Sequence, residues 1–302
     1  MMRSAIGHIP VLVKEVLETL EPRSGKIYLD VTFGGGGHTR ALLDAEPGVR
    51  VYALDWDLKA AERAEPLLEE YGERFAFVWG GFGSLYKIAK KEKFPLFDGI
   101  LADFGTSQYQ LQEGEGFSFN TDTPLDMRMS QSHFKVTAKM IVNNSSEREL
   151  AELFFTYGEE SAAKRIAKKI VEVRAQQPIE TTGQLAKFVA SVIPFHERTT
   201  HPATKVFQAL RICVNHELEQ IESLLAIATS LLNPGGRLAC ITFHSLEDRL
   251  VKQAFKQKEK DDQGHLLRPD FREASDEEKM LNPSSRSAKL RVFEKGNLNL
   301  TK

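Results

Sequence analysis

Hydrophobic positions in the first hundred residues alternate between two spacings. Short runs of β-branched and aromatic residues predict strands, and the stretches between them repeat apolar residues every three or four positions, which predicts helices. The alternation of strands and helices indicates a parallel sheet with crossover helices, and hence an α/β fold. The predicted strands are 27–33, 49–55, 75–79 and 97–104, and the predicted helices are 11–20, 38–45, 58–71 and 85–93.

The pattern changes after Phe104. Residues 105–130 are rich in Gly, Ser, Asp and Thr and form a loop too long for an ordinary connection. Only helical patterns follow, and Ser146 with Glu149 forms a candidate capping box before the first of them. We therefore predict an all-helical insertion whose helices cover 147–157, 159–176 and 182–193.

Strands and helices alternate again in the last third of the chain. Pro202 suits the first turn of a helix that continues, whole or as a broken pair, to about Leu232. Asn233-Pro234-Gly235-Gly236 predicts a turn, and it is followed by a strand at 238–244, a helix at 246–258 and a closing strand at 290–294. The predicted domains are a discontinuous one, 1–112 with 202–302, and the insertion with its leading loop, 113–201.

Composition narrows the class of protein. Hydrophobic residues make up 41% and charged residues 27% of the 302 positions, as in ordinary globular proteins. No apolar run reaches the roughly 18 residues of a membrane span, and the first ten residues lack a signal-peptide pattern. The only cysteines, Cys213 and Cys240, exclude a disulfide framework and a Cys-rich zinc site. We expect a cytoplasmic protein without a membrane anchor.

The charge of the chain indicates less about its function than its composition does. The net charge of −2 decides nothing about nucleic acid, because the distribution of charge matters more than its sum. Basic residues gather in the part after Arg249 and in a second cluster, and both could face phosphates. On charge alone, a solvated helix face is the better interpretation. The second cluster consists of Lys164, Arg165, Lys168, Lys169 and Arg174.

A glycine run, Gly34 to Gly37, directly follows the first predicted strand. A strand, a glycine-rich turn and a helix form the nucleotide-binding arrangement of α/β sheets, because glycine lets the backbone approach a ligand. Asp55, at the tip of the second strand, can accept hydrogen bonds from ribose hydroxyls. Alternatively, the glycines form a plain flexible turn and Asp55 is a helix N-cap. The glycine run and Asp55 together, in this order on these elements, favour a ligand site.

The turn favours S-adenosylmethionine over NAD. Thr39 stands where the dinucleotide fingerprint has its third glycine, which serves a pyrophosphate that S-adenosylmethionine lacks. Asp30, just before the turn, would suit a sulfonium or amino group. The run also lacks the Gly-Lys-Ser/Thr ending of a P-loop, which disfavours a nucleotide triphosphatase.

Asp103 and Phe104 end the fourth predicted strand, at the edge where ligands of such sheets bind. An exocyclic base amine is a poor nucleophile, and a carboxylate that accepts from its N–H groups helps to localise the lone pair; an Asp matches cytosine N4 in this way. An aromatic ring can stack on an extruded base. Alternatively, Asp103 caps the next loop and Phe104 belongs to the core.

His244 follows the fifth predicted strand and can line the same edge, while Ser245 is equally suited to cap the next helix. Gln208, Arg211 and Asn215 share a polar helix stripe that borders a cleft or meets water. No His/Cys/Asp/Glu cluster has a metal-binding spacing. We expect no metal, because positioning supplies most of the help in methyl transfer from a sulfonium.

Eight segments, taken together and in order, resemble one family. From His8 nearly to its end, the chain is similar to the MraW (RsmH) family of cytosine-N4 methyltransferases, which act on small-subunit ribosomal RNA. The segments are HIPVLVKEVL from His8, YLDVTFGGGGH from Tyr28, DGILADFGTS from Asp98, GFSFNTDTPLDMRM from Gly116, YGEESAAKRIAKKI from Tyr157, HPATKVFQALRICVNHEL from His201, FHSLEDRLVK from Phe243 and NPSSRSAKLRV from Asn282.

The resemblance implies a class I Rossmann-like methyltransferase domain interrupted by a helical domain. It implies methylation of the N4 atom of a cytidine in the decoding region of 16S ribosomal RNA. The partner would be the assembled small ribosomal subunit in the bacterial cytoplasm, and a homodimer stays open. The implied S-adenosylmethionine contacts are Gly36, Gly37, His38, Asp55, Phe82, Asp103 and Gln110, and the implied reaction-site residues are Asp103, Phe104 and His244.

The chain departs from the family pattern at three places. It reads Ser107-Gln108-Tyr109-Gln110 where the family usually has Ser-Ser-Pro-Gln, and it has Glu115 and Ser284 where the family favours Arg. These departures bear on RNA affinity and on the role of Gln110 more than on the reaction class. The alternatives are an amino-methyltransferase for another nucleic acid or a small amine, an NAD-dependent oxidoreductase, and an inactive RNA-binding assembly factor.

Overall fold

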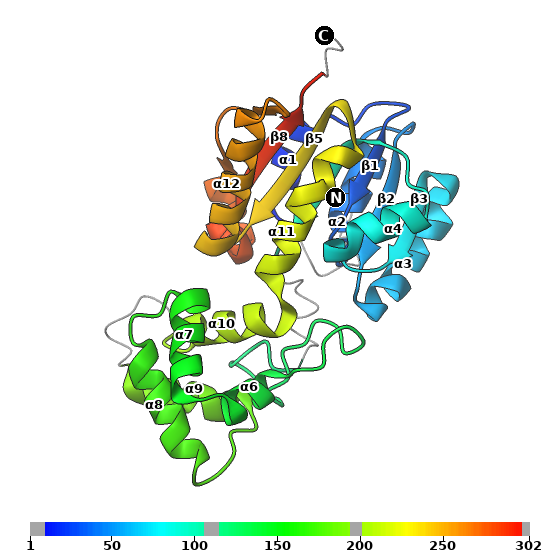
Figure 1. Ribbon diagram of the computed structural model, residues 1–302. Coiled ribbons are helices and arrows are strands. Elements are labelled where there is room, and N and C mark those ends of the chain that lie inside the picture. Colours follow the sequence, from blue (N-terminus) through cyan, green and yellow to red (C-terminus); the bar gives the residue numbers. More distant parts are fainter. Residues whose placement is uncertain (1–9, 106–114, 194–200, 298–302) are drawn as a thin grey trace. The chain divides into compact units, whose positions relative to one another are not determined.

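The computed structural model describes residues 10–105, 115–193 and 201–297 (Figure 1). The chain divides into two compact units. Unit 1 comprises Met1–Ser107 and Leu218–Lys302, and unit 2 comprises Gln108–Glu217. Among the described residues, no helix is both long and apolar enough to cross a membrane.

Unit 1 is built on one mixed sheet of strand order β3-β2-β1-β4-β5-β8-β6, in which β7 also pairs with β8. The first five strands are parallel and β6, β7 and β8 are antiparallel to their neighbours. This order confirms the predicted α/β fold with a mostly parallel sheet. The strands are β1 Ile27–Asp30, β2 Arg50–Asp55, β3 Phe75–Trp79, β4 Phe97–Asp103, β5 Leu232–Thr242, β6 Gly264–Leu266, β7 Arg272–Glu273 and β8 Lys289–Lys295.

Helices cover both faces of this sheet. Neighbouring strand residues point to opposite faces, so Tyr28 packs in the apolar cluster with α1, α2 and α3, and Leu29 packs in the cluster with α4, α11 and α12. These two clusters are the core of unit 1. Its helices are α1 Val13–Leu20, α2 Gly37–Ala45, α3 Leu58–Tyr71, α4 Leu85–Lys91, α11 Glu217–Ile227, α12 Ser245–Lys260 and α13 Asp276–Leu281.

Strand β5 begins earlier than the sequence predicts. The Asn-Pro-Gly-Gly run was expected to precede the strand, but it lies inside β5, where Gly235 has a φ of 74°. The register shifts here: Phe97 of β4 pairs with Leu232, and Gly99 pairs with Arg237. The turn residues are therefore the extra residues of an irregularity in the strand rather than a connection before it.

Unit 2 is helical in its described part, apart from one isolated bridge between Pro124 and Thr181. The predicted capping box is present, since the Ser146 hydroxyl accepts from Glu149 N and the Glu149 carboxylate accepts from Ser146 N. Its core gathers one apolar face from each helix, including Phe154, Ile170 and Leu210. The helices are α6 Ala138–Asn144, α7 Glu147–Gly158, α8 Ala163–Arg174, α9 Thr182–Val192 and α10 Thr204–Asn215.

Helix α10 belongs to unit 2, so the return to unit 1 falls at Leu218 and not at the predicted position 202. The reason is close packing: a Cβ added to Gly158 of α7 would lie 2.6 Å from the Lys205 carbonyl oxygen of α10.

The polar stripe of α10 is also structural. Asn215 is fully buried, accepts from Met129 N and donates to the Met127 carbonyl oxygen. It therefore neither lines a cleft nor meets water.

Candidate functional site

Three aspartates end three neighbouring strands of unit 1. Asp30 is the last residue of β1, Asp55 of β2 and Asp103 of β4, and β1 lies between the other two. The carboxyl ends of parallel strands meet at one edge of the sheet, where ligands of such folds bind. The topology thus gathers at this edge the carboxylates that the sequence singled out.

Asp55 is held by two main-chain donors. Its Oδ2 accepts from Gly34 N at 2.7 Å and its Oδ1 accepts from Asp57 N at 2.9 Å. The N-cap of α3 is Asp57, which excludes the alternative interpretation of Asp55 as a cap. Burial raises the pKa of Asp55 to about 6, against the lowering effect of these donors. A carboxylate has about four lone-pair positions, so two remain for a ligand.

The glycine turn is fixed by the protein's own packing. Gly36 is the N-cap of α2 with a φ of 76°, and a Cβ there would lie 2.7 Å from the Phe33 ring. A Cβ on Gly37 would lie 2.8 Å from Pro10. The sequence interpretation assigned these glycines to a ligand and missed the two contacts, because the spacing of the motif does not show which side chains pack against the turn.

Asp30 ties this turn to the neighbouring strand. It is 1% exposed; its Oδ2 accepts from the Thr39 hydroxyl at 2.8 Å and its Oδ1 from the Thr32 hydroxyl at 3.3 Å. Thr32 Oγ1 in turn accepts from Asp103 N at 2.7 Å. Burial raises the pKa of Asp30. Both carboxylate oxygens thus have protein partners, although the sequence suggested that Asp30 faces a cationic ligand.

His38 and Asp103 lie beside each other. His38 is 6% exposed, and its Nε2 is 2.8 Å from the Val11 carbonyl oxygen. Because a carbonyl only accepts, Nε2 carries a hydrogen. The His38 Nδ1 is 3.7 Å from Asp103 Oδ2. The Asp103 side chain keeps 21% of its surface exposed; burial raises its pKa to about 6, and His38 opposes that rise.

Three aromatic rings adjoin this edge. The Phe82 ring centroid is 5.7 Å from that of Phe104 and 6.0 Å from that of Trp56. Phe104 is 7% exposed and packs in the core, so in this structure its ring supports Phe82 and offers little surface for stacking on a base. Sequence reasoning missed Trp56, whose only signal was its position directly after Asp55.

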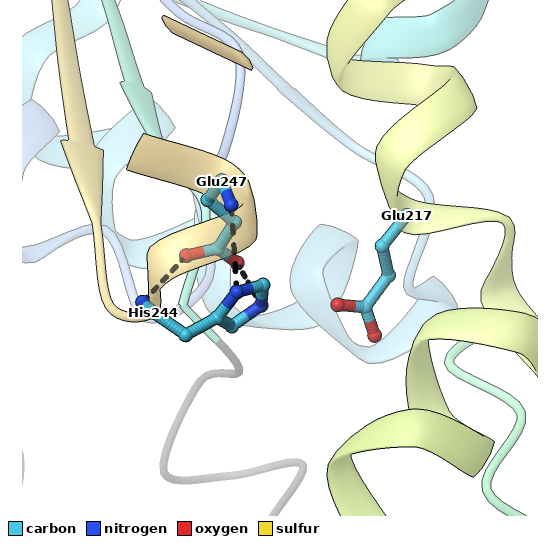
Figure 2. A group of neighbouring side chains, drawn as sticks. All are labelled: Glu217, His244 and Glu247. Atoms are coloured by element: carbon cyan, nitrogen blue, oxygen red, sulfur yellow. Dashed lines mark hydrogen bonds and ion pairs between the residues drawn. The ribbon is translucent and has the colours of Figure 1, made fainter. Parts of the chain in front are cut away.

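His244 and Glu247 form the N-terminal cap of α12 (Figure 2). His244 Nδ1 accepts from Glu247 N at 3.4 Å, while Glu247 Oε2 accepts from Phe243 N at 2.7 Å and from His244 N at 3.2 Å. The cap is thus His244 and not the predicted Ser245. His244 Nε2 is 3.0 Å from Glu247 Oε1. Glu247 is fully buried, and sequence reasoning missed it, although its spacing from His244 is that of a capping box.

Gln110 lies in 106–114, outside the described residues. The remaining predicted residues, Gly36, Gly37, His38, Asp55, Phe82, Asp103, Phe104 and His244, all belong to unit 1 and follow or adjoin the carboxyl ends of β1 to β5.

The strand order β3-β2-β1-β4-β5, the glycine turn after β1 and the aspartate at the end of β2 define a class I Rossmann-like methyltransferase domain. The helical unit between β4 and β5 interrupts it. The chain belongs to the MraW methylase family, whose model matches residues 5–296.

Similar curated proteins carry the name ribosomal RNA small subunit methyltransferase H. That of Nostoc punctiforme is 47% identical over 299 residues, which are 96% of this chain and 95% of the relative. That of Thermomicrobium roseum is 48% identical over 305 residues, covering 95% and 93%. Among solved structures, a putative rRNA-methylase from Clostridium thermocellum aligns with a TM-score of 0.46 and 13% identity, covering 95% of this chain and 99% of that one.

Proposed function

We propose that this chain transfers a methyl group from S-adenosylmethionine to the exocyclic N4 of a cytidine in the decoding region of small-subunit (16S) ribosomal RNA. Membership of the MraW methylase family and the names of its relatives support the reaction class and the RNA. The observation that carries the proposal is the Asp103 carboxylate, partly exposed at the edge that also holds the glycine turn and Asp55. A carboxylate there matches an amine acceptor.

S-adenosylmethionine supplies a methyl group on a positively charged sulfonium. Asp55 would accept from the ribose hydroxyls with the lone pairs that Gly34 and Asp57 leave available. Phe82 and the main chain at Gly36 and Gly37 would form further contacts with the cofactor. By family resemblance, Gln110 completes this set.

The charges of the site fit a cationic ligand. Burial raises the pKa of Asp55 and of Asp103 to about 6, because neither charged carboxylate is fully compensated by the protein. A positive charge at this edge would lower both pKa values and stabilise both carboxylates. A pyrophosphate would act in the opposite direction, so the electrostatics support S-adenosylmethionine over a dinucleotide.

Asp103 is mostly ionised at neutral pH and would accept a hydrogen bond from the cytidine N4–H, which keeps the nitrogen lone pair available for in-line attack on the methyl group. The C–S bond would break as the N–C bond forms, so S-adenosylhomocysteine leaves and the extra N4 proton passes to solvent. His38 acts through Asp103, since its own ring is buried. His244 borders the base, with its ring oriented by Glu247. Phe104 contributes by supporting Phe82.

The proposed partner is the assembled small ribosomal subunit, and the proposed compartment is the bacterial cytoplasm. The reaction needs neither a covalent enzyme intermediate nor a metal, because alignment of the nucleophile with the methyl group provides most of the rate enhancement.

The test is transfer of labelled methyl from S-adenosylmethionine to small subunits that lack the cytosine-N4 mark, followed by nucleoside analysis. We expect N4-methylcytidine from the wild type and at least a 100-fold loss with Asp103→Ala, the order of effect found when one electrostatic group of a reaction site is removed. Asp98→Ala is the matched control, because Asp98 lies near the opposite end of the same strand. There its carboxylate accepts hydrogen bonds from the Lys26 side chain and from Ile27 N.

A different methylated nucleoside would move the proposal to another acceptor. Methylation of a small amine or of free duplex nucleic acid would do the same. Binding of S-adenosylmethionine without any transfer would favour the assembly-factor alternative.

A further inference from the structure

Helix α8, labelled in Figure 1, carries four cations between the positions that pack in the core of unit 2. Ala163, Ile166, Ala167 and Ile170 are buried in the core of the unit. Between them Lys164, Arg165 and Lys168 are exposed and Lys169 is half-buried. We call these four residues, Lys164, Arg165, Lys168 and Lys169, the basic ridge.

No side chain of the basic ridge makes a hydrogen bond or ion pair within the described residues. Several other cations of unit 2 are paired. Arg128 binds Asp126, Arg211 binds Glu217 and Lys139 binds Glu180. Lys135, Arg148 and Lys187 also have no partner among the described residues, but the ridge differs from them because it gathers four such cations on one face of one helix.

Arg174, which the sequence grouped with these residues, does not belong to the ridge. Its guanidinium donates to the carbonyl oxygens of Val142 and Ser145 at the end of α6. It is a structural cap of that helix end. At the same end of α8, the exposed Glu172 limits the ridge.

The placement of the ridge opposes helix stability. Lys164 and Lys168, like Arg165 and Lys169, are like charges four residues apart on one helix, which repel. Lys164 and Arg165 also lie in the first turn of α8, which has no acidic residue, where positive charge is unfavourable beside the helix dipole. Selection for folding alone would favour Glu at these positions, so the cations require another explanation.

We propose that the basic ridge binds the sugar-phosphate backbone of the ribosomal RNA substrate. Charges four residues apart repeat about every 6 Å along a helix axis, a linear array that suits a polyanion better than a single small anion. Phosphates would also relieve the repulsion within the ridge and the conflict with the helix dipole. The inference rests on the proposed function for the identity of the RNA, and it assigns the helical unit a share of substrate binding.

The test is the double variant Lys164→Glu/Lys168→Glu, assayed for methyl transfer to small subunits over a range of salt concentrations. At about 0.15 M salt we expect kcat/KM to fall roughly 10-fold or more through KM, with kcat at saturation retained. The slope of log(kcat/KM) against log[salt] should become shallower by about 1 to 2, because each phosphate contact contributes roughly 0.7 to 0.9. Affinity for S-adenosylmethionine, measured by calorimetry, should not change.

Stability separates this role from a structural one. Because Glu suits the first turn of a helix, the variant should melt at the same temperature as the wild type or slightly above it. Lys164→Arg/Lys168→Arg should retain wild-type KM. The matched control is Lys187→Glu, an exposed lysine on α9 of the same unit, which should also retain it.

If the wild type is active and the double variant has an unchanged KM, the proposed RNA-binding role of the ridge is refuted, while the proposed function stands. An equal loss in Lys187→Glu would overturn it too, because the effect would then follow net charge. If the wild type methylates no subunit, the proposed function fails, and retention of 16S ribosomal RNA on filters still tests the ridge: equal retention of wild type and double variant would overturn it.

Discussion

The Asp103 carboxylate should make the ligand-free protein less stable than it would be with a neutral group. Burial raises its folded pKa to about 6, whereas an unfolded Asp has a pKa near 3.9. Between these values the folded state binds more protons than the unfolded state, so the free energy of unfolding falls as pH rises. The difference of about two pKa units corresponds to a penalty of about 3 kcal/mol above pH 7.

Asp103→Asn removes this penalty. The substitution could weaken the hydrogen bond from Gly105 N to Asp103 Oδ1, but this bond is already long, at 3.5 Å. Allowing for partial solvent exposure, we expect the variant to be more stable than the wild type by about 1 to 3 kcal/mol at pH 8.

The assay is thermal unfolding of both proteins without cofactor at pH 5 and pH 8. For a domain of this size, the gain at pH 8 corresponds to roughly 3 to 8 °C. It should exceed the gain at pH 5 by about 1 kcal/mol, because only part of the penalty is present below the folded pKa. Methyl transfer should be lost in the same variant.

A variant less stable than the wild type at pH 8, or a difference that does not change with pH, would refute this reasoning. Asp98→Asn is the matched control on the same strand. It should lose stability, because both Asp98 oxygens accept hydrogen bonds, from Lys26 and from Ile27 N.

Three further predictions follow from the same site. Binding of S-adenosylmethionine near pH 6 should release protons, since a cationic ligand lowers the pKa of carboxylates that titrate near 6; calorimetry in buffers of different ionisation enthalpy measures this, and proton uptake would contradict it. Gly37→Ala should cost about 1 to 3 kcal/mol in urea unfolding, because its Cβ would lie 2.8 Å from Pro10; a neutral effect would mean that Pro10 yields freely. Thr39→Val should also cost about 1 to 3 kcal/mol, because it removes a buried donor to Asp30, and Thr39→Ser should restore most of the loss.

Much of the fold of unit 1 could be predicted from local patterns. The helix 58–71 and the strand 75–79 have the predicted bounds, because the helix lies between Asp57 and Gly72 and the strand is an unbroken run of five apolar residues that ends before Gly80. The short elements β6, β7 and α13 were missed, since two to six residues are too few to establish a period. Local chemistry misled at β5, where residues typical of a turn form a strand irregularity.

The candidate site was predictable only where topology alone decides position. Asp55 and Asp103 end parallel strands, so their placement followed from the fold class. The tie from Asp30 through Thr32 to Asp103 joins residues about 70 positions apart and has no local signal. Likewise, whether Phe104 faces a substrate or the core depends on its packing against Phe82, which spacing does not reveal.

The tie at Asp30 also restricts how this enzyme can be redesigned. One buried carboxylate holds Thr39 of the glycine turn and, through the Thr32 hydroxyl, the main chain of Asp103. If the turn and Asp103 have the roles proposed above, a change in turn length between positions 32 and 39 would displace the carboxylate that binds the amine along with the bound methyl donor. Variants with altered substrate choice should arise more readily from changes at His244, whose side-chain hydrogen bond within the described part of the chain belongs to the cap of its own helix, than from changes to the turn.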